Sequence, residues 1–295
     1  MPIVDHARLL ACWTRPCRSP AMRKALVNPL PAHPVPDALD VTRPHPARMY
    51  DFYLGGKDNW QADRDAARQI LAVAPEVRAI ARANRDFLRR AVTYLAKEKG
   101  ITQFLDIGTG IPTAPNVHQV AAAHAAGTRV VYADNDPVIH AHANALLTGT
   151  GTTRIIFADL RDPDLILTGA KEFLDFTQPV ALLLVAILHF IPDAEDPPGL
   201  LAAYRDALPP GSYLALSHGT SDFHPADVTG TATAAYDSAA APLVLRPRPA
   251  IEALLAGFTP EPPGLVQAPL WHPETKPKPK DLEKIGIYAA VAAKN

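Results

Sequence analysis

The stretch QFLDIGTGIPTAPN (103–116) decides the fold, because an apolar run ending at Asp106 leads directly into a turn with Gly108 and Gly110. A strand, a glycine-rich turn and a helix in succession are typical of nucleotide-binding α/β proteins. Thr113 stands where the dinucleotide fingerprint G-x-G-x-x-G has its third glycine. No Gly-Lys-Ser/Thr follows the turn, so the stretch is not a phosphate-binding P-loop either.

Segments typical of strands and helices alternate on both sides of this turn. The helical pattern at 61–97 is divided into two helices by Pro75, because proline disrupts a helix interior. Predicted strands are 103–107, 129–134, 154–159, 180–188, 211–219, 264–271 and 285–293, and predicted helices are 116–127, 136–148, 163–176, 197–208, 224–241 and 250–257. The alternation predicts a mostly parallel sheet with helices on both faces. The last two strands, with no helix between them, indicate one antiparallel strand.

Composition limits the classes of function. The 295 residues are 48% hydrophobic and 20% charged with a formal net charge of −1, so nothing indicates a nucleic-acid or anionic membrane partner. The longest apolar run, VALLLVAIL (180–188), is about half the length of a membrane-spanning helix. The cysteines, Cys12 and Cys17, are too few for a disulfide framework, and no cluster has the spacing of a metal site. We expect a cytoplasmic protein without a bound metal.

The N-terminal region differs from the rest of the chain. Residues 1–42 are predicted to form a disordered leader, because many of the 31 prolines lie there and no apolar periodicity is present. The region has no apolar core long enough for a signal peptide, and a start at Met22 would leave residues 1–21 outside the native protein. Residues 43–100 are expected to form a helical lid and residues 101–295 the ligand-binding domain.

Three carboxylates fall at the ends of successive predicted strands: Asp106, Asp134 and Asp159. Ligands of open sheets bind beyond these ends, so the three are expected to meet one ligand. A pyrophosphate is disfavoured, because each like-charge contact at roughly 5 Å costs on the order of 3 kcal/mol at a dielectric of about 20. S-adenosylmethionine (SAM) carries an ammonium and a sulfonium instead. Asp106 would favour this charge, Asp134 would accept both ribose hydroxyls, and Asp159 would accept the adenine amino group, while Gly108 and Gly110 let the backbone approach closely.

Several longer blocks resemble a known family. DIGTGIPTAPN, VVYADNDP, FADLRDP and LLLVAILHFIPD occur in this order between ARMYDFYLGGKDNWQADRDAA (47–67) and LALSHGTSD. Over roughly residues 43–293 the chain looks like a largely actinobacterial family of SAM-dependent methyltransferase-like proteins, long catalogued as a domain of unknown function. The resemblance implies the class I SAM-dependent methyltransferase (Rossmann-like) fold, with a seven-stranded, mostly parallel sheet whose last strand is antiparallel. It also implies SAM as cofactor, but it supplies no methyl acceptor.

Neighbouring residues complete the predicted cofactor site. Asn116 begins the helix after the turn, where capping and ligand contact are compatible, and Asn135 would flank the adenine. The aromatic block YDFYLGGKDNW (50–60) is interpreted as a lid loop hinged at its glycines. Arg85 is predicted to lie on a solvated helix face, with contact to the methionine carboxylate of the cofactor as the alternative. The remaining predicted cofactor contacts are Leu160, Ala186, Tyr50 and Gly56.

Two histidines, His189 and His218, follow strand ends and are the candidate general bases for methyl transfer. The acceptor is expected to be a small molecule in a pocket walled by the lid and by residues 221–250. A regulator or sensor that binds SAM without consuming it is the alternative, because the sequence contains no unmistakable acid/base pair. An NAD-dependent oxidoreductase is disfavoured by Asp106 and by the missing third glycine.

Overall fold

The computed structural model describes residues 40–147 and 151–295, so the predictions for Cys12, Cys17 and Met22, and most of the predicted leader, lie outside the described residues. The described chain forms one sheet in the order β3-β2-β1-β4-β5-β8-β6, with β7 also paired to β8. The parallel strands are β1 (Gln103–Ile107), β2 (Arg129–Asp134), β3 (Thr153–Phe157), β4 (Ala181–Val185) and β5 (Tyr213–Gly219). The last strand, β8 (Ile287–Lys294), is antiparallel to β5. The predicted mostly parallel sheet with an antiparallel last strand is confirmed.

The sixth strand position is divided between two short strands. β6 (Phe258–Pro260) pairs with the end of β8, and β7 (Val266–Gln267) pairs with its beginning. Pro262 and Pro263 lie between them and cannot donate the hydrogen bonds of a continuous ladder. The predicted strand 264–271 is wrong in most of its length, because only Val266–Gln267 is a strand and the chain continues as a 3₁₀ turn at Ala268–Leu270.

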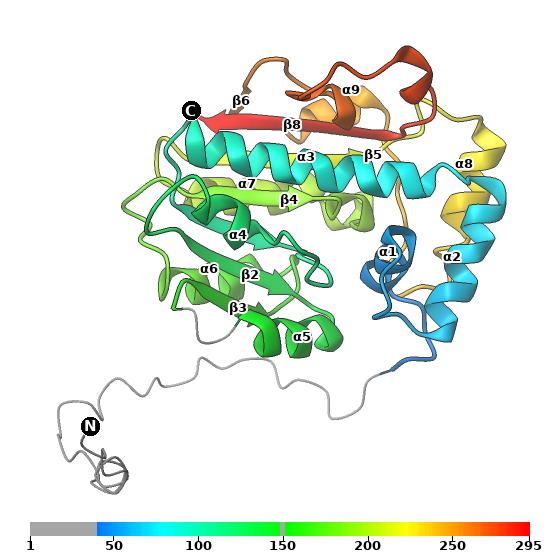
Figure 1. Cartoon of the computed structure of the whole chain (residues 1–295), viewed down its shortest axis with the longest axis horizontal. Helices are drawn as coiled ribbons and strands as arrows, with labels where there is room; N and C mark the ends of the chain where they lie inside the picture. Colours follow the sequence, from blue (N-terminus) through cyan, green and yellow to red (C-terminus); the bar gives the residue numbers. More distant parts are fainter. Residues whose placement is uncertain (1–39, 148–150) are drawn as a thin grey trace, which may run out of the picture. The chain divides into compact units, whose positions relative to one another are not determined.

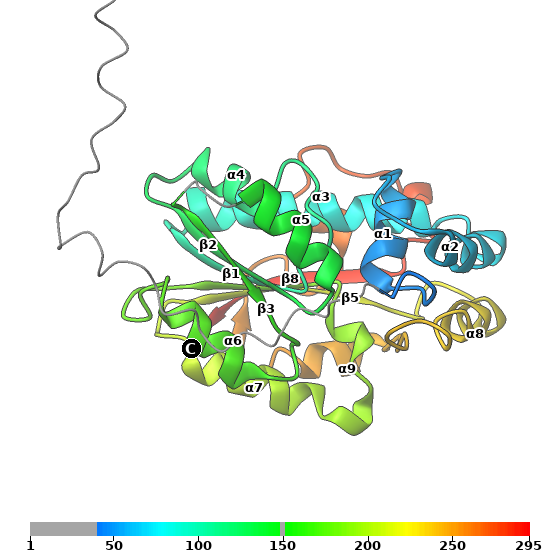
Figure 2. The ribbon, with the colours of Figure 1, turned by 90° about the horizontal axis from the view of Figure 1, so that it is seen from below.

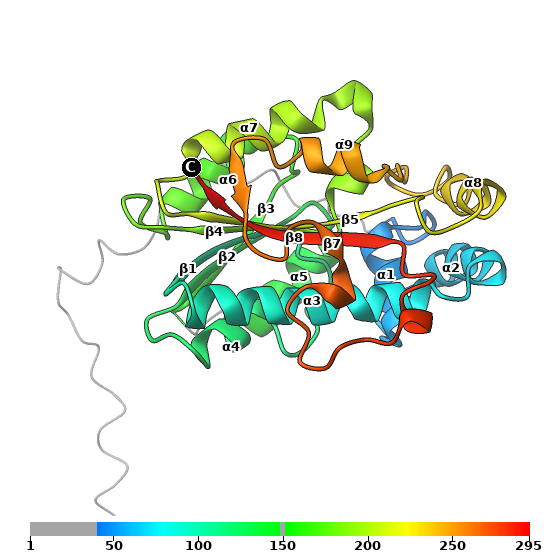
Figure 3. The same ribbon diagram turned by 90° about the horizontal axis from the view of Figure 1, so that it is seen from above.

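Helices cover both faces of the sheet, as Figures 2 and 3 show. One layer contains α3 (Val77–Lys97), α4 (Val117–Ala122) and α5 (Pro137–Leu147), and the other contains α6 (Pro163–Lys171), α7 (Pro197–Ala207) and α9 (Arg248–Ala253). Neighbouring strand residues point to opposite faces. Phe104 packs into the core on the α3 side with Phe87, whereas Leu105 packs into the other core with Tyr204. Among the described residues, no helix is long and apolar enough to span a bilayer.

A third group of helices lies beyond the carboxyl ends of the parallel strands (Figure 1). These are α1 (Pro46–Leu54), α2 (Gln61–Val73) and α8 (Ala226–Ala234). They share a hydrophobic cluster that includes Met49, Ile70 and Tyr236. The predicted loop 50–60 is wrong in its first half, because α1 continues to Leu54 and ends only where Gly55 adopts φ 86°. Pro46, at the first turn of α1, favours a helix start and was the missed signal.

Other boundaries also differ from the prediction. The helix after the glycine turn ends at Ala122 instead of 127, and α8 is half as long as the predicted 224–241 segment. β4 ends at Val185 instead of 188, because Ala186 adopts a left-handed φ of 59° that no strand continues. A 3₁₀ turn at Leu188–Phe190 follows. This early end of β4 opens the sheet edge at which the candidate site lies.

Candidate cofactor and acceptor site

A cavity of about 600 Å³ lies between the carboxyl ends of the strands and the helices α1, α2 and α8. Its volume is within the range of small-molecule sites. Its lining combines the turn after β1, the ends of β2 and β4, and the inner sides of the three helices. The predicted residues that line it are Tyr50, Asp106, Gly108, Gly110, Asp134, Asn135, Asp159, Leu160, Ala186 and His189.

Asp106 and Asp134 are buried carboxylates at the ends of β1 and β2, with exposed fractions of 5% and 6%. Burial raises the pKa of Asp106 to about 6, although a hydrogen bond from Thr109 and the charge of Arg85 oppose the rise. Burial also raises the pKa of Asp134 to about 7, against hydrogen bonds from the backbone of Asp136 and Gly110. A cation or a hydroxyl donor in this cavity would therefore find two poorly compensated carboxylates.

Asp134 holds the glycine turn in place. Its Oδ2 accepts a hydrogen bond from the Gly110 N–H at 2.9 Å, and its Oδ1 accepts one from the Asp136 N–H at 3.0 Å. Gly110 has φ 67°, and no atom lies within 4 Å of where its Cβ would be. The backbone at Gly110 is therefore open for a ligand to approach closely.

The two buried carboxylates predict how the stability of the ligand-free protein depends on pH. The pKa of Asp134 is 3.8 in an ordinary environment and about 7 when folded, so between these values the folded state holds a proton that the unfolded chain has lost. The free energy of unfolding therefore decreases as pH rises from about 4 to about 7. We expect the midpoint of thermal unfolding to fall between about pH 4 and about pH 7, and to fall less in Asp134→Asn. An unchanged slope in Asp134→Asn would contradict this assignment.

Gly108 is required by close packing as well as by its backbone. Its φ is 73°, and a Cβ there would lie 2.6 Å from Cγ1 of Ile187. Arg85 holds the far side of the turn, since its Nη2 donates hydrogen bonds to the carbonyls of Thr113 at 2.7 Å and Pro115 at 3.3 Å. Arg85 also lines the cavity, so the prediction of a solvated helix face is wrong.

Gly108→Ala is expected to destabilise the protein more than Gly127→Ala. Both glycines have φ 73°, but no atom lies within 4 Å of a Cβ at position 127. Each substitution costs about 1–2 kcal/mol for the left-handed backbone, and the contact with Ile187 adds about 1–3 kcal/mol at position 108. Chemical denaturation followed by circular dichroism measures the difference. Equal losses would show that Ile187 moves aside without cost.

Asn135 and Asp159 meet at the ends of β2 and β3. The Asn135 Nδ2 donates to Asp159 Oδ2 at 2.6 Å, and Asp159 Oδ1 accepts from the Arg161 N–H at 2.8 Å. The Arg161 side chain also pairs with Glu195, which lines the cavity. Leu160, 5% exposed, supplies an apolar surface between them. This part of the site offers amide and carboxylate acceptors beside an apolar wall, which suits an adenine ring.

A chain of buried hydrogen bonds connects the end of β4 to α1. The Ala186 N–H donates to Ser217 Oγ at 2.9 Å, and the Ser217 hydroxyl donates to Asn84 Oδ1 at 2.6 Å. Asn84 Nδ2 donates to the Tyr50 hydroxyl at 3.0 Å, which donates in turn to the Ala81 carbonyl at 2.9 Å. Burial raises the pKa of Tyr50 to about 12. The left-handed backbone of Ala186 is thus held by this chain of hydrogen bonds, as is common for strained residues at functional sites.

Three predicted site residues lie outside the cavity lining. Asn116 is the cap residue of α4, where its N–H donates to Gln119 Oε1 at 2.8 Å. Gly56 approaches Asp51, and a Cβ at Gly56 would lie 1.9 Å from Asp51 Oδ1. Gly56 is therefore required by the turn after α1. His218 is the third such residue.

The general-base role predicted for His218 is contradicted by its contacts. The side chain is fully buried, Nδ1 lies 2.7 Å from the Gly219 carbonyl, and Nε2 lies 2.9 Å from Nη1 of Arg246. Nδ1 must carry the proton and Nε2 must accept from Arg246, so neither nitrogen is free for a substrate. Burial, with a further contribution from Arg246, lowers the pKa of His218 to about 4.

His189 lines the cavity but is arranged as a donor. Its Nδ1 accepts a hydrogen bond from the Gly219 N–H at 3.1 Å. In the neutral ring the proton then resides on Nε2. Burial, with contributions from His218 and Arg246, lowers the pKa of His189 well below its usual value. This geometry favours hydrogen-bond donation by His189 over the predicted role of general base.

The half of the cavity farther from the carboxylates is largely apolar. The sequence predicted only which segments would form its walls. It is walled by α1, α2, the start of α3, α8 and residues near 243. The predicted walls, namely the lid and residues 221–250, both contribute. Sequence reasoning missed two pairs here, Tyr53 with Tyr236 and His224 with Glu76, because their members are far apart in the chain. Among the described residues, no group of His, Cys, Asp and Glu side chains could hold a metal ion.

The donor set suits SAM better than a dinucleotide. The cavity presents two buried carboxylates, an open glycine backbone and an amide–carboxylate pair, and these match a cation, ribose hydroxyls and an adenine. A pyrophosphate would meet like charges at Asp106 and Asp134. The residues present therefore fit SAM.

Comparisons with known proteins agree with this geometry. A family model described as S-adenosyl methyltransferase matches residues 32–295. A DUF574 family protein from Streptomyces avermitilis is 42% identical in sequence, with a TM-score of 0.83 over 88% of this chain and 100% of that chain. A candidate methyltransferase from Thermobifida fusca is 36% identical, with a TM-score of 0.82 over 88% of this chain and 98% of that chain. No curated protein matches the sequence.

Proposed function

Because the chain belongs to the S-adenosyl methyltransferase family, we propose that it methylates a small-molecule acceptor bound in the apolar half of the cavity. The protein is a SAM-dependent methyltransferase with a Rossmann-like sheet. The observation that carries the proposal is the continuity of one cavity from the carboxylates of β1 and β2 to an apolar chamber under α1, α2 and α8. A SAM sensor needs the first part only, so the second part favours an enzyme.

The carboxylate end of the cavity would hold the cofactor. Asp134 would accept the ribose hydroxyls, Asn135 and Asp159 would meet the adenine, and Asp106 would lie near the cationic methionine portion. Arg85 would fix the glycine turn through its two backbone contacts. SAM, when bound, supplies a methyl group on an already activated sulfonium.

The residues of the chain contribute alignment and exclusion of water. Ser217, Asn84 and Tyr50 fix Ala186 and join the sheet to α1, so the boundary between the two halves of the cavity is rigid. Holding donor and acceptor in line contributes a large part of the rate of such a displacement. His189 would orient an acceptor atom through its Nε2–H.

The helices beyond the strand ends would act as the cover of the site. α1 and α2 belong to the segment 43–100 that is predicted to be a lid, and α8 completes the cover. The C-terminal half of α3 instead packs on the sheet through Phe87 and Leu95. We place the functional boundary of the cover near Pro75, between α2 and α3.

Cytoplasmic location and the lack of a nucleic-acid partner are further parts of the proposal. Their support is the net charge of −1 over a chain with 29 basic and 30 acidic residues, which offers no excess of positive charge for a phosphate backbone. A cavity closed over by helices also suits small acceptors better than polymers.

A turnover assay with a fractionated bacterial extract tests this function. The extract is separated by ultrafiltration into small molecules and macromolecules, and S-adenosylhomocysteine (SAH) formation is measured with each fraction. We expect SAH with the small-molecule fraction, and loss of this activity in Ala232→Trp, which fills the apolar half from α8. The matched control is Ala234→Trp, at an exposed position of the same helix. SAH formation with macromolecules only, or with neither fraction, would overturn the proposal.

A further inference from the structure

The apolar half of the cavity ends at a buried pair, His224 and Glu76. His224 follows β5, and Glu76 precedes α3 as its cap residue. His224 Nε2 lies 3.0 Å from Glu76 Oε1, and the two side chains are 8% and 13% exposed. Nε2 is buried without a well-aligned hydrogen bond among the described residues, so the carboxylate lies to one side of the N–H direction. His224 is a lining residue of the cavity.

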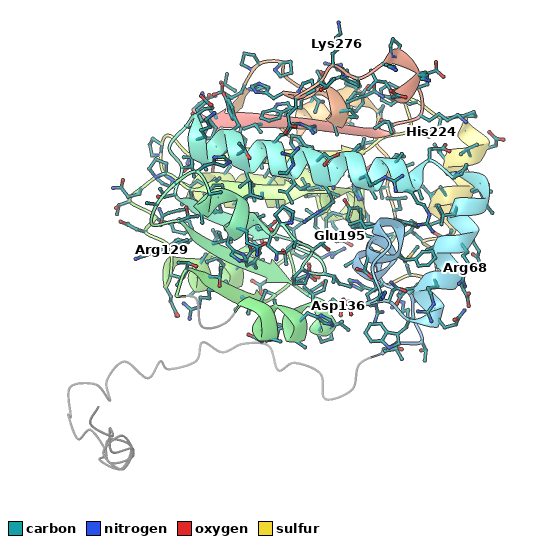
Figure 4. The ribbon with its side chains drawn as sticks, in the orientation of Figure 1. Arg68, Arg129, Asp136, Glu195, His224 and Lys276 are labelled. Atoms are coloured by element: carbon teal, nitrogen blue, oxygen red, sulfur yellow. The ribbon has the colours of Figure 1, made fainter. Side chains whose placement is uncertain are left out.

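The chain makes room for this imidazole. A Cβ at Gly286 would lie 2.8 Å from Cε1 of His224 and 3.0 Å from its Nδ1. The beginning of β8 therefore needs glycine where the ring packs. Figure 4 shows His224 beside the start of α3 and near α8, well away from Asp136 at the opposite side of the site. The pair thus belongs to the end of the cavity remote from the cofactor residues.

The distance between the cofactor end of the cavity and the His224–Glu76 end can be estimated along helix α3. Asn84 lies at the cofactor end, because it is joined through Ser217 to Ala186. Glu76 precedes Asn84 by a little over two turns of helix, which is roughly 12 Å of rise. Between them the cavity is walled by apolar side chains, including Ile70, Val77, Ile80, Val228, Ala232 and Leu243. A molecule that reaches both ends therefore has an elongated apolar body.

One polar group of this half is poorly satisfied by the protein. His224 Nε2 is buried without a well-aligned hydrogen bond among the described residues, whereas the Tyr53 hydroxyl has that of Tyr236 as its neighbour. An unpaired buried polar group costs about 1–3 kcal/mol unless a ligand or water satisfies it. A ligand hydroxyl beside His224 would supply the well-aligned hydrogen bond that Glu76 does not.

Charge decides what group the remote end can take. Among the described residues that line the cavity, the arginines are Arg85 and Arg161, and both contact the cofactor half. Glu76 disfavours a carboxylate or phosphate beside it. A hydroxyl can donate to Glu76 and accept from His224, and so satisfies both.

We propose that His224 and Glu76 form a subsite that binds a neutral hydroxyl-type group at the far end of an elongated, apolar methyl acceptor. The inference rests on the proposed function, since it assigns the apolar half to the acceptor. The pair binds the end of the acceptor remote from the methylated atom and takes no part in the transfer.

Calorimetry with two rigid probes tests the subsite. The protein is first saturated with SAH and then titrated with p-phenylphenol, which has one terminal hydroxyl, or with p,p′-biphenol, which has one at each end. We expect the wild type to bind p,p′-biphenol about tenfold more tightly, as one well-placed hydrogen bond to a charged group allows. In His224→Phe and in Glu76→Gln this preference is expected to fall to within about twofold, while p-phenylphenol binds as before.

The controls separate the subsite from the cofactor site. His142→Phe, at a half-exposed histidine outside the cavity lining, is expected to keep the full preference. Failure of SAH to bind the wild type would contradict the proposed function, whereas normal SAH binding without a preference for p,p′-biphenol would overturn the subsite alone. Should His224→Phe fail to fold, Glu76→Gln decides the question, because it keeps the shape of the side chain. A preference retained in Glu76→Gln would then reject the subsite, as would failure of both probes to bind the SAH complex.

Discussion

Asp134→Asn is expected to weaken SAM binding at least tenfold while the fold is retained. The carboxylate is 6% exposed, and both of its oxygens accept backbone hydrogen bonds that set the glycine turn. Asparagine keeps one acceptor oxygen but loses the second acceptor and the charge, so the ribose hydroxyls lose a charge-assisted bond of about 1.5–3 kcal/mol. This free energy corresponds to roughly ten- to a hundredfold in affinity. Calorimetric titration with SAM and with SAH measures the change.

The matched control is a carboxylate outside the site. Asp206, at the end of α7, is 68% exposed and pairs with Arg205. Asp206→Asn is therefore expected to change SAM affinity by less than about twofold, because exposed pairs contribute about 0–1 kcal/mol. Circular dichroism of both variants verifies the fold. Asp134→Asn with SAM affinity within about twofold of the wild type would remove Asp134 from the cofactor site.

The residues that we propose for the cofactor site could be grouped from the sequence because their signals are local. Asp106, Gly108 and Gly110 lie within one strand–turn–helix unit, and a left-handed glycine after an apolar strand is recognisable from the sequence. Asp134 and Asp159 follow strands that parallel pairing brings to the same edge of the sheet. Neither inference depends on how distant helices pack.

The boundary between the two halves of the cavity, and the acceptor half, could not be predicted in the same way. Asn84 meets Ser217 only because α3 crosses the sheet at one angle, and the two are far apart in sequence. The protonation of His189 depends on a backbone N–H of Gly219, which no side-chain pattern records. His218 is the opposite case. Its position after a strand predicted a catalytic role, but its Nε2 is already hydrogen-bonded to Arg246, which lies in a loop distant in sequence. Which residues far apart in sequence become hydrogen-bond partners depends on the tertiary structure, so local sequence patterns could not predict them.

Arg48→Ala is expected to cost about 3–5 kcal/mol of stability, because it removes the guanidinium from two buried carboxylates and leaves them only backbone N–H donors and His45. Arg48 Nε lies 3.3 Å from Asp63 Oδ1 and 3.7 Å from Asp136 Oδ2, and the three side chains are 5%, 0% and 3% exposed. The cluster joins α1 and α2 to the start of α5, beside the cofactor end of the cavity. Figure 4 shows Asp136 near α1 and Arg68 on the outer side of α2. Loss of the cluster therefore loosens the cover where it meets the cofactor residues.

Arg68→Ala supplies the comparison within the same helix pair. Arg68 lies 2.9 Å from Asp65, a shorter separation than either contact of Arg48, but both side chains are more than half exposed, at 56% and 55%. Solvent screening limits such a pair to about 0–1 kcal/mol. Urea denaturation of the two variants thus tests whether burial or distance sets the strength of an Arg–Asp pair here. If Arg48→Ala lost no more stability than Arg68→Ala, the buried cluster would not anchor the cover.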